Sequence, residues 1–310
     1  MIDAFIDALQ SFPRGLVFVA EGLIILALAK FAKDLATRHY RVDQEISSNG
    51  NVAVALRLSG YFIAVMLILL GALYQPLTGG GWVSSAELEA AGGFGFNREL
   101  GEEVLRVFLY ALAGIVALNL VRVLFDRLVL YKFQLEKEVV QDRNAGAGAA
   151  EFGMYLATGL LIAGAVAGDP RGNEMEAALV ALAFFGMGLA LLVAFAVFYE
   201  FTTSFNIHDE IERDNSAVGI AFGGNLVAIG LITMKAVFGS FDGWGESIAS
   251  FLVFGVLGFA LLYAVRLLID LILLPTVKVS QALAGGRNVG VALVEGAVVI
   301  GAALVLFVAI

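Results

Sequence analysis

Two carboxylates stand inside apolar stretches of this sequence, and each follows an Arg–Asn pair. Glu151 lies in RNAGAGAAEFG (residues 143–153) and Glu295 lies in RNVGVALVEGA (residues 287–297), in both cases seven residues after the Asn. An isolated charge at the centre of a bilayer costs roughly 2.5–3.5 kcal/mol on insertion scales. Carboxylates in such a setting need partners, and the chemistry open to them is proton exchange or cation binding.

A basic and an acidic residue precede each Asn at matching distances. Arg122 and Arg266 lie 22 residues before it, and Asp126 and Asp270 lie 18 residues before it. The helical rise would bring each Arg level with the Glu of its own antiparallel hairpin. We therefore expect one ion pair in each hairpin, with the Asp one turn nearer the cytoplasm. Each hairpin thus holds a triad of one Arg, one Asp and one Glu. With two acids and one base, each triad has a surplus carboxylate, which suits a protonatable or cation-binding group. The alternative is a structural lock between helices.

The elements that position these residues are membrane-spanning helices. Hydrophobic residues make up 60% of the chain, charged residues only 15%, and the mean hydropathy is +0.90. Soluble domains have about 25% charged residues, so this is the composition of a membrane protein. The apolar runs are continuous, which excludes the alternating strands of a β-barrel. The sequence predicts an all-α membrane bundle of eight spans, at about 15–34, 52–74, 104–130, 146–167, 177–200, 216–237, 250–274 and 289–309.

No catalytic or cofactor motif accompanies the spans. The chain has no Cys, which excludes disulfides and thiolate metal ligands. Walker loops, His–Glu zinc patterns and serine elbows are also lacking, and there is no basic stripe for nucleic acid. We expect a non-enzymatic protein without metal or cofactor. Its expected partners are the lipid bilayer and either further copies of itself, as a homo-oligomer, or other membrane subunits.

Lys and Arg residues are divided unequally between the two sides of the bundle. Eleven lie in the links after spans one, three, five and seven, and five lie on the other side. The positive-inside rule then places both termini outside the cytoplasm. The segment 75–103, which holds five Glu and one Arg, would be a loop on the same outer side.

Four segments that enter the even-numbered spans are related to one another. Each begins with Asn and has Ala or Gly at the second and fourth following positions. Asn is a good helix N-cap, and small residues spaced by four let neighbouring helices approach closely. The segments therefore predict parallel helical-hairpin repeats related by an axis along the membrane normal. They are NVAVALRLSG, NAGAGAAEFG, NSAVGIAFGG and NVGVALVEGA, and they begin at Asn51, Asn144, Asn215 and Asn288.

The charged triads occur only in the second and fourth repeats, so the four hairpins predict a tandem duplication with pseudo-two-fold symmetry. The first four-helix unit would be residues 1–170 and the second 171–310, with a join near 168–176. Copies one and three carry Leu58 and Phe222 in place of the Glu.

Other polar side chains inside the spans have simpler expected roles. Asn119 and Asn225 are expected to make hydrogen bonds between helices. Arg57 is expected to extend back to the cytoplasmic face. Glu21 lies alone in the first span, where it would be either a member of an ion pathway or an interfacial carboxylate.

An acidic link followed by Asn and a small-residue ladder characterises the third repeat, DEIERDNSAVGIAFGGNLVAIG (residues 209–230). It resembles the YjfL-like bacterial inner-membrane proteins, a family defined by a four-span domain of unknown function (350). The resemblance implies two such units in tandem and a bacterial inner-membrane location, and it carries over no catalytic residue. The fourth repeat departs from the pattern, because its link VSQALAGGRN has no acidic residue.

Two functions fit these expectations. The first is an ion- or proton-linked conduit or transporter, with Glu151 and Glu295 as the titrating or cation-binding groups. Arg122 and Arg266 would be their counter-charges. The alternative is a non-catalytic scaffold or accessory subunit of a larger membrane complex, which would use its small-residue faces to bind other helices.

Overall fold

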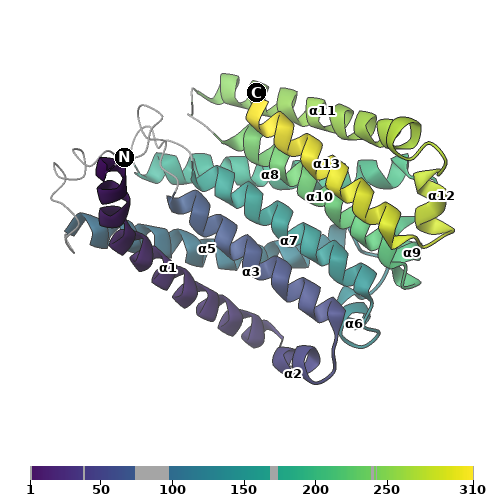
Figure 1. Cartoon of the computed structure of the whole chain (residues 1–310), viewed down its shortest axis with the longest axis horizontal. Coiled ribbons are helices and arrows are strands. Elements are labelled where there is room, and N and C mark those ends of the chain that lie inside the picture. Colours follow the sequence, from purple (N-terminus) through teal and green to yellow (C-terminus); the bar gives the residue numbers. More distant parts are fainter. Residues whose placement is uncertain are drawn as a thin grey trace.

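The computed structural model describes residues 2–37, 39–73, 98–167, 174–238, 241 and 243–309. These residues form helices and short connections, without strands. The helices are α1 (Ile2–Ala36), α2 (Val42–Ser47), α3 (Val52–Leu73), α5 (Arg98–Leu128), α6 (Leu135–Val140), α7 (Ala145–Val166), α8 (Glu174–Thr202), α9 (Ile207–Glu212), α10 (Ser216–Val237), α11 (Trp244–Leu268), the π-helical turn η1 (Ile269–Leu273), α12 (Val279–Ala284) and α13 (Val289–Ala309) (Figure 1).

The predicted eight-span, all-α architecture is confirmed. Eight of the described helices are long and apolar enough to cross a membrane, and each coincides with a predicted span. Between the spans of a hairpin lie four helices of six residues each, α2, α6, α9 and α12. They gather at one end of the bundle, which we call the short-helix end (Figure 1). Most of the predicted loop 75–103 and of the join 168–176 falls outside the described residues.

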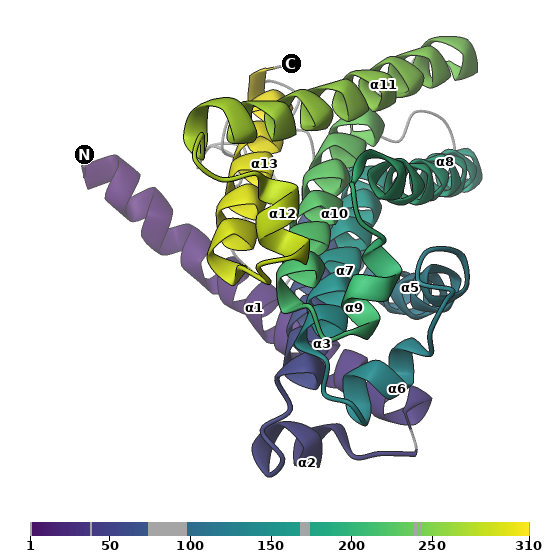
Figure 2. The same ribbon diagram turned by 90° about the vertical axis from the view of Figure 1, so that its right-hand side faces the viewer.

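A row of four parallel helices forms the centre of the bundle. Helices α3, α7, α10 and α13 contact one another in that order, and each starts at the short-helix end (Figure 2). Helices α1, α5, α8 and α11 run in the opposite direction and pack against the row (Figure 1). The shielding is uneven: about four fifths of the spans of α7 and α10 are buried, against half of α3 and a third of α13. The row therefore has two enclosed members and two terminal ones.

Small residues set the spacing within the row. A Cβ atom added at Gly148 in α7 would lie 2.7 Å from Ala53 Cα in α3. One added at Gly230 in α10 would lie 2.6 Å from Ala157 Cα in α7. Helix backbones touch at these points, so the predicted ladder of small residues acts as a packing surface.

The four predicted Asn N-caps are all present. Each Asn Oδ1 accepts a hydrogen bond from the backbone N–H three residues later, at 3.0–3.3 Å. In the first three repeats, the side-chain Nδ2 also donates to a carboxylate in the preceding short helix, Glu45, Glu138 or Glu210. The six-residue helices were missed in the sequence because they are too short to show a periodic pattern. In the first three repeats, their acidic residues position the caps that begin the spans.

Candidate functional site: two buried carboxylates in equivalent repeats

Glu151 is fully enclosed and bound by two guanidinium groups. Its side chain is 0% exposed. Arg122 of α5 donates from Nε to Glu151 Oε1 at 3.0 Å, which is the pairing predicted from matched heights. Arg57 of α3 donates from Nε to Glu151 Oε2. Both oxygens of this intramembrane carboxylate are therefore paired with cations.

Glu136, in the short helix α6, joins the same two arginines from the other side. Arg57 Nη1 donates to Glu136 Oε2 at 3.0 Å, and Arg122 Nη2 donates to the same oxygen. His39 Nε2 lies 3.4 Å from Glu136 Oε1 at the surface. A continuous line of charged groups thus connects Glu151 with the short-helix end of the molecule.

A third cation lies beside this network. Lys33 of α1 is 2% exposed, and its Nζ donates to Tyr155 Oη at 2.7 Å. The ammonium also lies 5.4 Å from the ring centroid of Tyr61 and 5.1 Å from that of Tyr155, within the range of cation–π attraction. Asn119 Nδ2 donates to Tyr61 Oη at 3.1 Å, the interhelical bond expected of it.

Two expectations about this first site are wrong. Arg57 does not extend to the surface: it is 1% exposed and bound to Glu151. Nor is Glu151 a surplus carboxylate: among the described residues, Arg57 and Arg122 form ion pairs with Glu136 and Glu151, and Lys33 lies beside them. Asp126 belongs to none of the ion pairs of the described residues. The reason is that α7 packs in parallel against α3, which supplies a cation that a hairpin-by-hairpin count leaves out.

Glu136 should contribute to the change of the free energy of unfolding with pH. Burial raises the pKa of the Glu136 carboxyl, but the guanidinium groups of Arg57 and Arg122 outweigh burial and hold that pKa below its ordinary value. The resulting stability is complete above the unfolded pKa of about 4.3 and is lost as the pH falls through the lower folded value. Unfolding in detergent should therefore become easier from pH 5 towards pH 3, by less in Glu136→Gln than in the wild type. Identical pH slopes would contradict this assignment.

Glu295 occupies the equivalent position in the fourth repeat but has different neighbours. It is 0% exposed, and its Oε1 accepts from Asn225 Nδ2 at 3.3 Å and from Tyr199 Oη at 3.4 Å. Its Oε2 is buried without a hydrogen-bond partner among the described groups. Asn225 thus makes the interhelical bond expected of it, and it does so to a carboxylate.

The predicted ion pair of the second half is not formed. Among the described residues, no nitrogen of Arg266 lies within 4.0 Å of a Glu295 oxygen. The Arg266 guanidinium instead packs 5.3 Å from the ring centroid of Tyr199, and its Nη2 donates to Ser280 Oγ at 3.1 Å. Its Nη1 is buried without a partner. Asp270 accepts from the Val279 backbone N–H at 2.9 Å and so holds the start of α12.

The two sites differ because the partners of Glu151 are replaced in the second half. Six residues after the Asn, the first repeat has Arg57 and the third has Ala221. Eight residues before the Asn, the second repeat has Glu136 and the fourth has Ser280. Without the second guanidinium and the bridging carboxylate, Arg266 turns to Tyr199 and Ser280.

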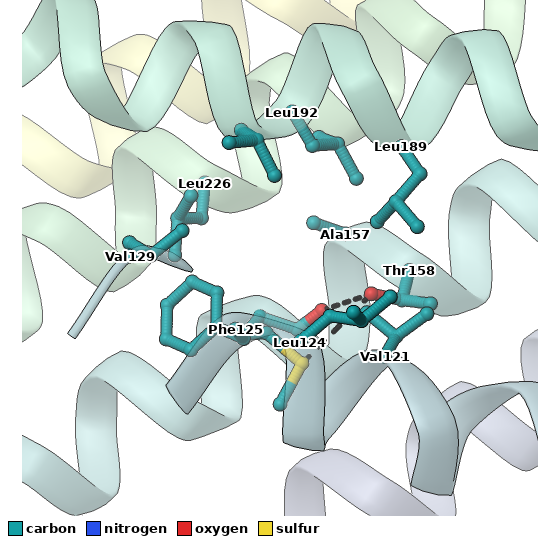
Figure 3. A pocket seen from close by; sticks show the side chains of 11 residues that line it. Val121, Leu124, Phe125, Val129, Ala157, Thr158, Leu189, Leu192 and Leu226 are labelled. Carbon is teal, nitrogen blue, oxygen red and sulfur yellow. Dashed lines mark hydrogen bonds between the residues drawn. The ribbon is translucent and has the colours of Figure 1, made fainter. Parts of the chain in front are cut away.

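Two further features lie apart from these sites. Glu21 of α1 is 5% exposed, and both of its oxygens lack hydrogen-bond partners in the described part of the chain. A pocket bounded by α5, α7, α8 and α10 is lined by apolar side chains such as Phe125 and Leu192 (Figure 3). Its one hydroxyl, that of Thr158, already donates to Met154 O at 2.8 Å. This pocket includes neither buried Glu.

The fold and these sites define a multi-pass membrane protein made of tandem helical hairpins. The chain belongs to the family described as Domain of Unknown Function (DUF350), whose model matches residues 7–166 and again residues 174–310. It is also similar to the UPF0719 transmembrane protein of Aquifex aeolicus (strain VF5), with 21% identity over 222 residues, 71% of this chain and 72% of that protein. No solved structure matches the chain. The resemblance to the four-span family, in two tandem units, is thereby confirmed.

Proposed function

We propose that this protein is a proton-linked conduit of the bacterial inner membrane, in which Glu295 takes up and releases the proton. One observation carries the proposal. Glu295 is fully enclosed, and among the described residues it has no ion pair and one oxygen without a hydrogen-bond partner. Buried polar groups are almost always satisfied, and an exception in an apolar site needs an explanation. An acid that gains a proton there loses its charge, and on losing the proton it can approach the partnerless Nη1 of Arg266.

Glu151 has the other role in this proposal. Its two oxygens are held by Arg57 and Arg122, so a proton would have to displace a guanidinium to reach them. We therefore assign Glu151 to the structural lock that joins α3, α5 and α7. The duplicated position would thus have diverged into one fixed centre and one exchanging centre.

Access to Glu295 would come from the short-helix end. Arg266 lies between Tyr199, which donates to Glu295, and Ser280 of the short helix α12. Intramembrane ionisable residues arranged in this way are typical of proton relays. The excess of Lys and Arg in the links supports a cytoplasmic position for this end, with both termini periplasmic.

Proton flux into proteoliposomes tests the proposal. Purified protein is reconstituted with a pH-sensitive dye inside the vesicles, and an imposed pH gradient is followed with and without a K⁺ diffusion potential. We expect the wild type to dissipate the gradient and Glu295→Gln to abolish that flux. Gln keeps the shape and the acceptor oxygen but cannot exchange a proton. Monovalent-cation flux, measured in parallel, identifies a cation conduit instead.

The matched control is Asp43→Asn, which removes a carboxylate whose side chain is 76% exposed. It should transport like the wild type. Vesicles with wild-type protein that hold the gradient as well as empty vesicles would refute the conduit and favour the scaffold. Unchanged flux in Glu295→Gln would refute the assignment of the proton-exchanging group to Glu295 but would leave the conduit itself standing.

A further inference from the structure

Among the described helices, the central row has an end without a further row neighbour. Helix α13 is a third buried, whereas α7 and α10, which have row neighbours on both sides, are about four fifths buried. On α13, the side chains of Leu293, Val294, Leu304 and Val305 are exposed. The three junctions inside the row, α3 with α7, α7 with α10 and α10 with α13, indicate what could cover this face.

All three junctions use the same register. The residue nine positions after the Asn of one repeat touches the residue eight positions after the Asn of the next. At the first two junctions, positions two and thirteen of one repeat similarly meet positions four and fifteen of the next. The nine-to-eight contacts are Gly60 with Phe152, Gly153 with Gly223 and Gly224 with Gly296. The others include Ala53 with Gly148, Gly146 with Gly219, Ala64 with Gly159 and Ala157 with Gly230.

The outward face of α13 also has small residues at positions two, nine and thirteen of its repeat, the positions that contact the next helix at the junctions inside the chain. Gly290, Ala297 and Gly301 lie two, nine and thirteen residues after Asn288. A Cβ at Gly301 would meet nothing within 4 Å, whereas its counterparts in α3 and α7, Ala64 and Ala157, contact the next helix. The fourth repeat is therefore built like a repeat that is followed by a fifth.

Two of the three positions of the first repeat that would face a preceding helix are small as well, and the third, fifteen residues after the Asn, is Met66. Ala55 and Ser59 lie four and eight residues after the first Asn, and Ser59 is exposed. Helix α1 touches α3 further along, where Gly22 meets Met66, and leaves Ile63 43% exposed. Helix α3 thus lacks a preceding repeat in the row, as α13 lacks a following one.

A polar contact repeats at each junction and is unmet at the last. Asn51 Nδ2 donates to Val139 O at 3.0 Å, Asn144 Nδ2 to Ile211 O at 2.5 Å, and Asn215 Nδ2 to Leu283 O at 2.9 Å. Each acceptor is the second-last residue of the next repeat's short helix. Asn288 is exposed and has no such acceptor among the described residues, although its Oδ1 still caps α13. The equivalent acceptor in the first repeat is the carbonyl of Ile46 in α2.

We propose that a second copy of this chain docks on α13 with its own α3, so that the row continues from copy to copy. Ala297 of one copy would face Ser59 of the next, and Asn288 would donate to Ile46 O of that copy. The helices of the row are parallel, so this contact keeps both copies in the same membrane orientation. The two surfaces differ, which makes the contact heterologous and leads to a ring or an open chain.

Cysteine cross-linking tests the register, because the natural chain has no Cys. Ser59→Cys, Ala297→Cys and the double variant are oxidised in native membranes. We expect a ladder of dimers and higher species, or one closed ring, from the double variant. Co-expression of the two single variants should give dimers only. Each single variant expressed alone should remain monomeric.

A bulky residue in the contact provides the second arm. Gly301→Trp in the double-cysteine chain should abolish the ladder. Gly186→Trp is the matched control, since a Cβ there also meets nothing within 4 Å and the residue lies on α8, away from the row ends; it should keep the ladder. Dimers from Ala297→Cys alone would show symmetric α13–α13 pairing and overturn the proposal. So would a double variant that stays monomeric both on oxidation and in native mass spectrometry from nanodiscs.

Discussion

Replacing Glu151 by Gln is expected to lower the free energy of unfolding by about 3–5 kcal/mol, the usual result of removing one partner from a buried ion pair. The substitution keeps the shape of the side chain but leaves Arg57, which is 1% exposed, without its enclosed counter-charge. Glu136 alone would then have to balance Arg57, Arg122 and the nearby Lys33. The loss can be measured by SDS titration in mixed micelles, followed by far-UV circular dichroism.

The equivalent substitution in the second half is the natural control. Glu295→Gln removes a charge that has no ion pair in the described part of the chain, and Gln can still accept from Asn225 and Tyr199. We expect a loss of about 1 kcal/mol or less. Adding Arg57→Met to Glu151→Gln should restore part of the stability, because the unbalanced cation is gone. Equal losses for the two Gln variants would mean that the arginines do not depend on Glu151 for their burial.

Much of this fold could be predicted because local rules determine it. The spans follow from apolar length, and the caps follow from Asn at the lipid entry. The pairing of Arg122 with Glu151 required only the helical rise and the antiparallel arrangement of one hairpin. These inferences depend on neighbours in the chain and need no knowledge of which repeats touch.

The rest of the first site depends on contacts between repeats. Arg57 belongs to α3 and Lys33 to α1, so neither shares a hairpin with Glu151. A pattern in the sequence could have identified Arg57. It lies six residues after the Asn of the first repeat, and Glu151 lies seven residues after the Asn of the second, and these two positions face each other where the two repeats pack together. Lys33 lies 18 residues before Asn51, at the position that Asp126 and Asp270 occupy in their repeats, so a comparison of all four repeats could have singled it out as well.

The failed pairing in the second half has a related cause. Arg266 and Glu295 have the spacing of Arg122 and Glu151, and the spacing does bring them to the same site. Whether they form an ion pair is decided by the surrounding groups. Ala221 and Ser280 remove the charges that hold the first site together, and the aromatic face of Tyr199 then competes for the guanidinium.

The packing of the central row leads to a second large effect, at Gly153. A Cβ at this position would overlap the Cα, carbonyl carbon and oxygen of Gly223, all of which are backbone atoms of α10. A flexible side chain could rotate away, but a helix backbone can only move as a unit. Gly153→Ala is therefore expected to destabilise the protein by about 1–3 kcal/mol, the cost of overpacking a filled interior, despite the higher helix propensity of Ala.

Gly186→Ala isolates the packing effect because the chemical change is identical. The position is helical, and a Cβ there meets nothing within 4 Å. Only the propensity gain applies, so we expect stabilisation of up to about 1 kcal/mol. We expect opposite signs for the same substitution, measured by the same SDS titration, because only Gly153 lies against the backbone of a neighbouring helix, α10. If Gly153→Ala were as stable as Gly186→Ala, α7 and α10 would have room between them. Close backbone contact would then not be what holds the row together.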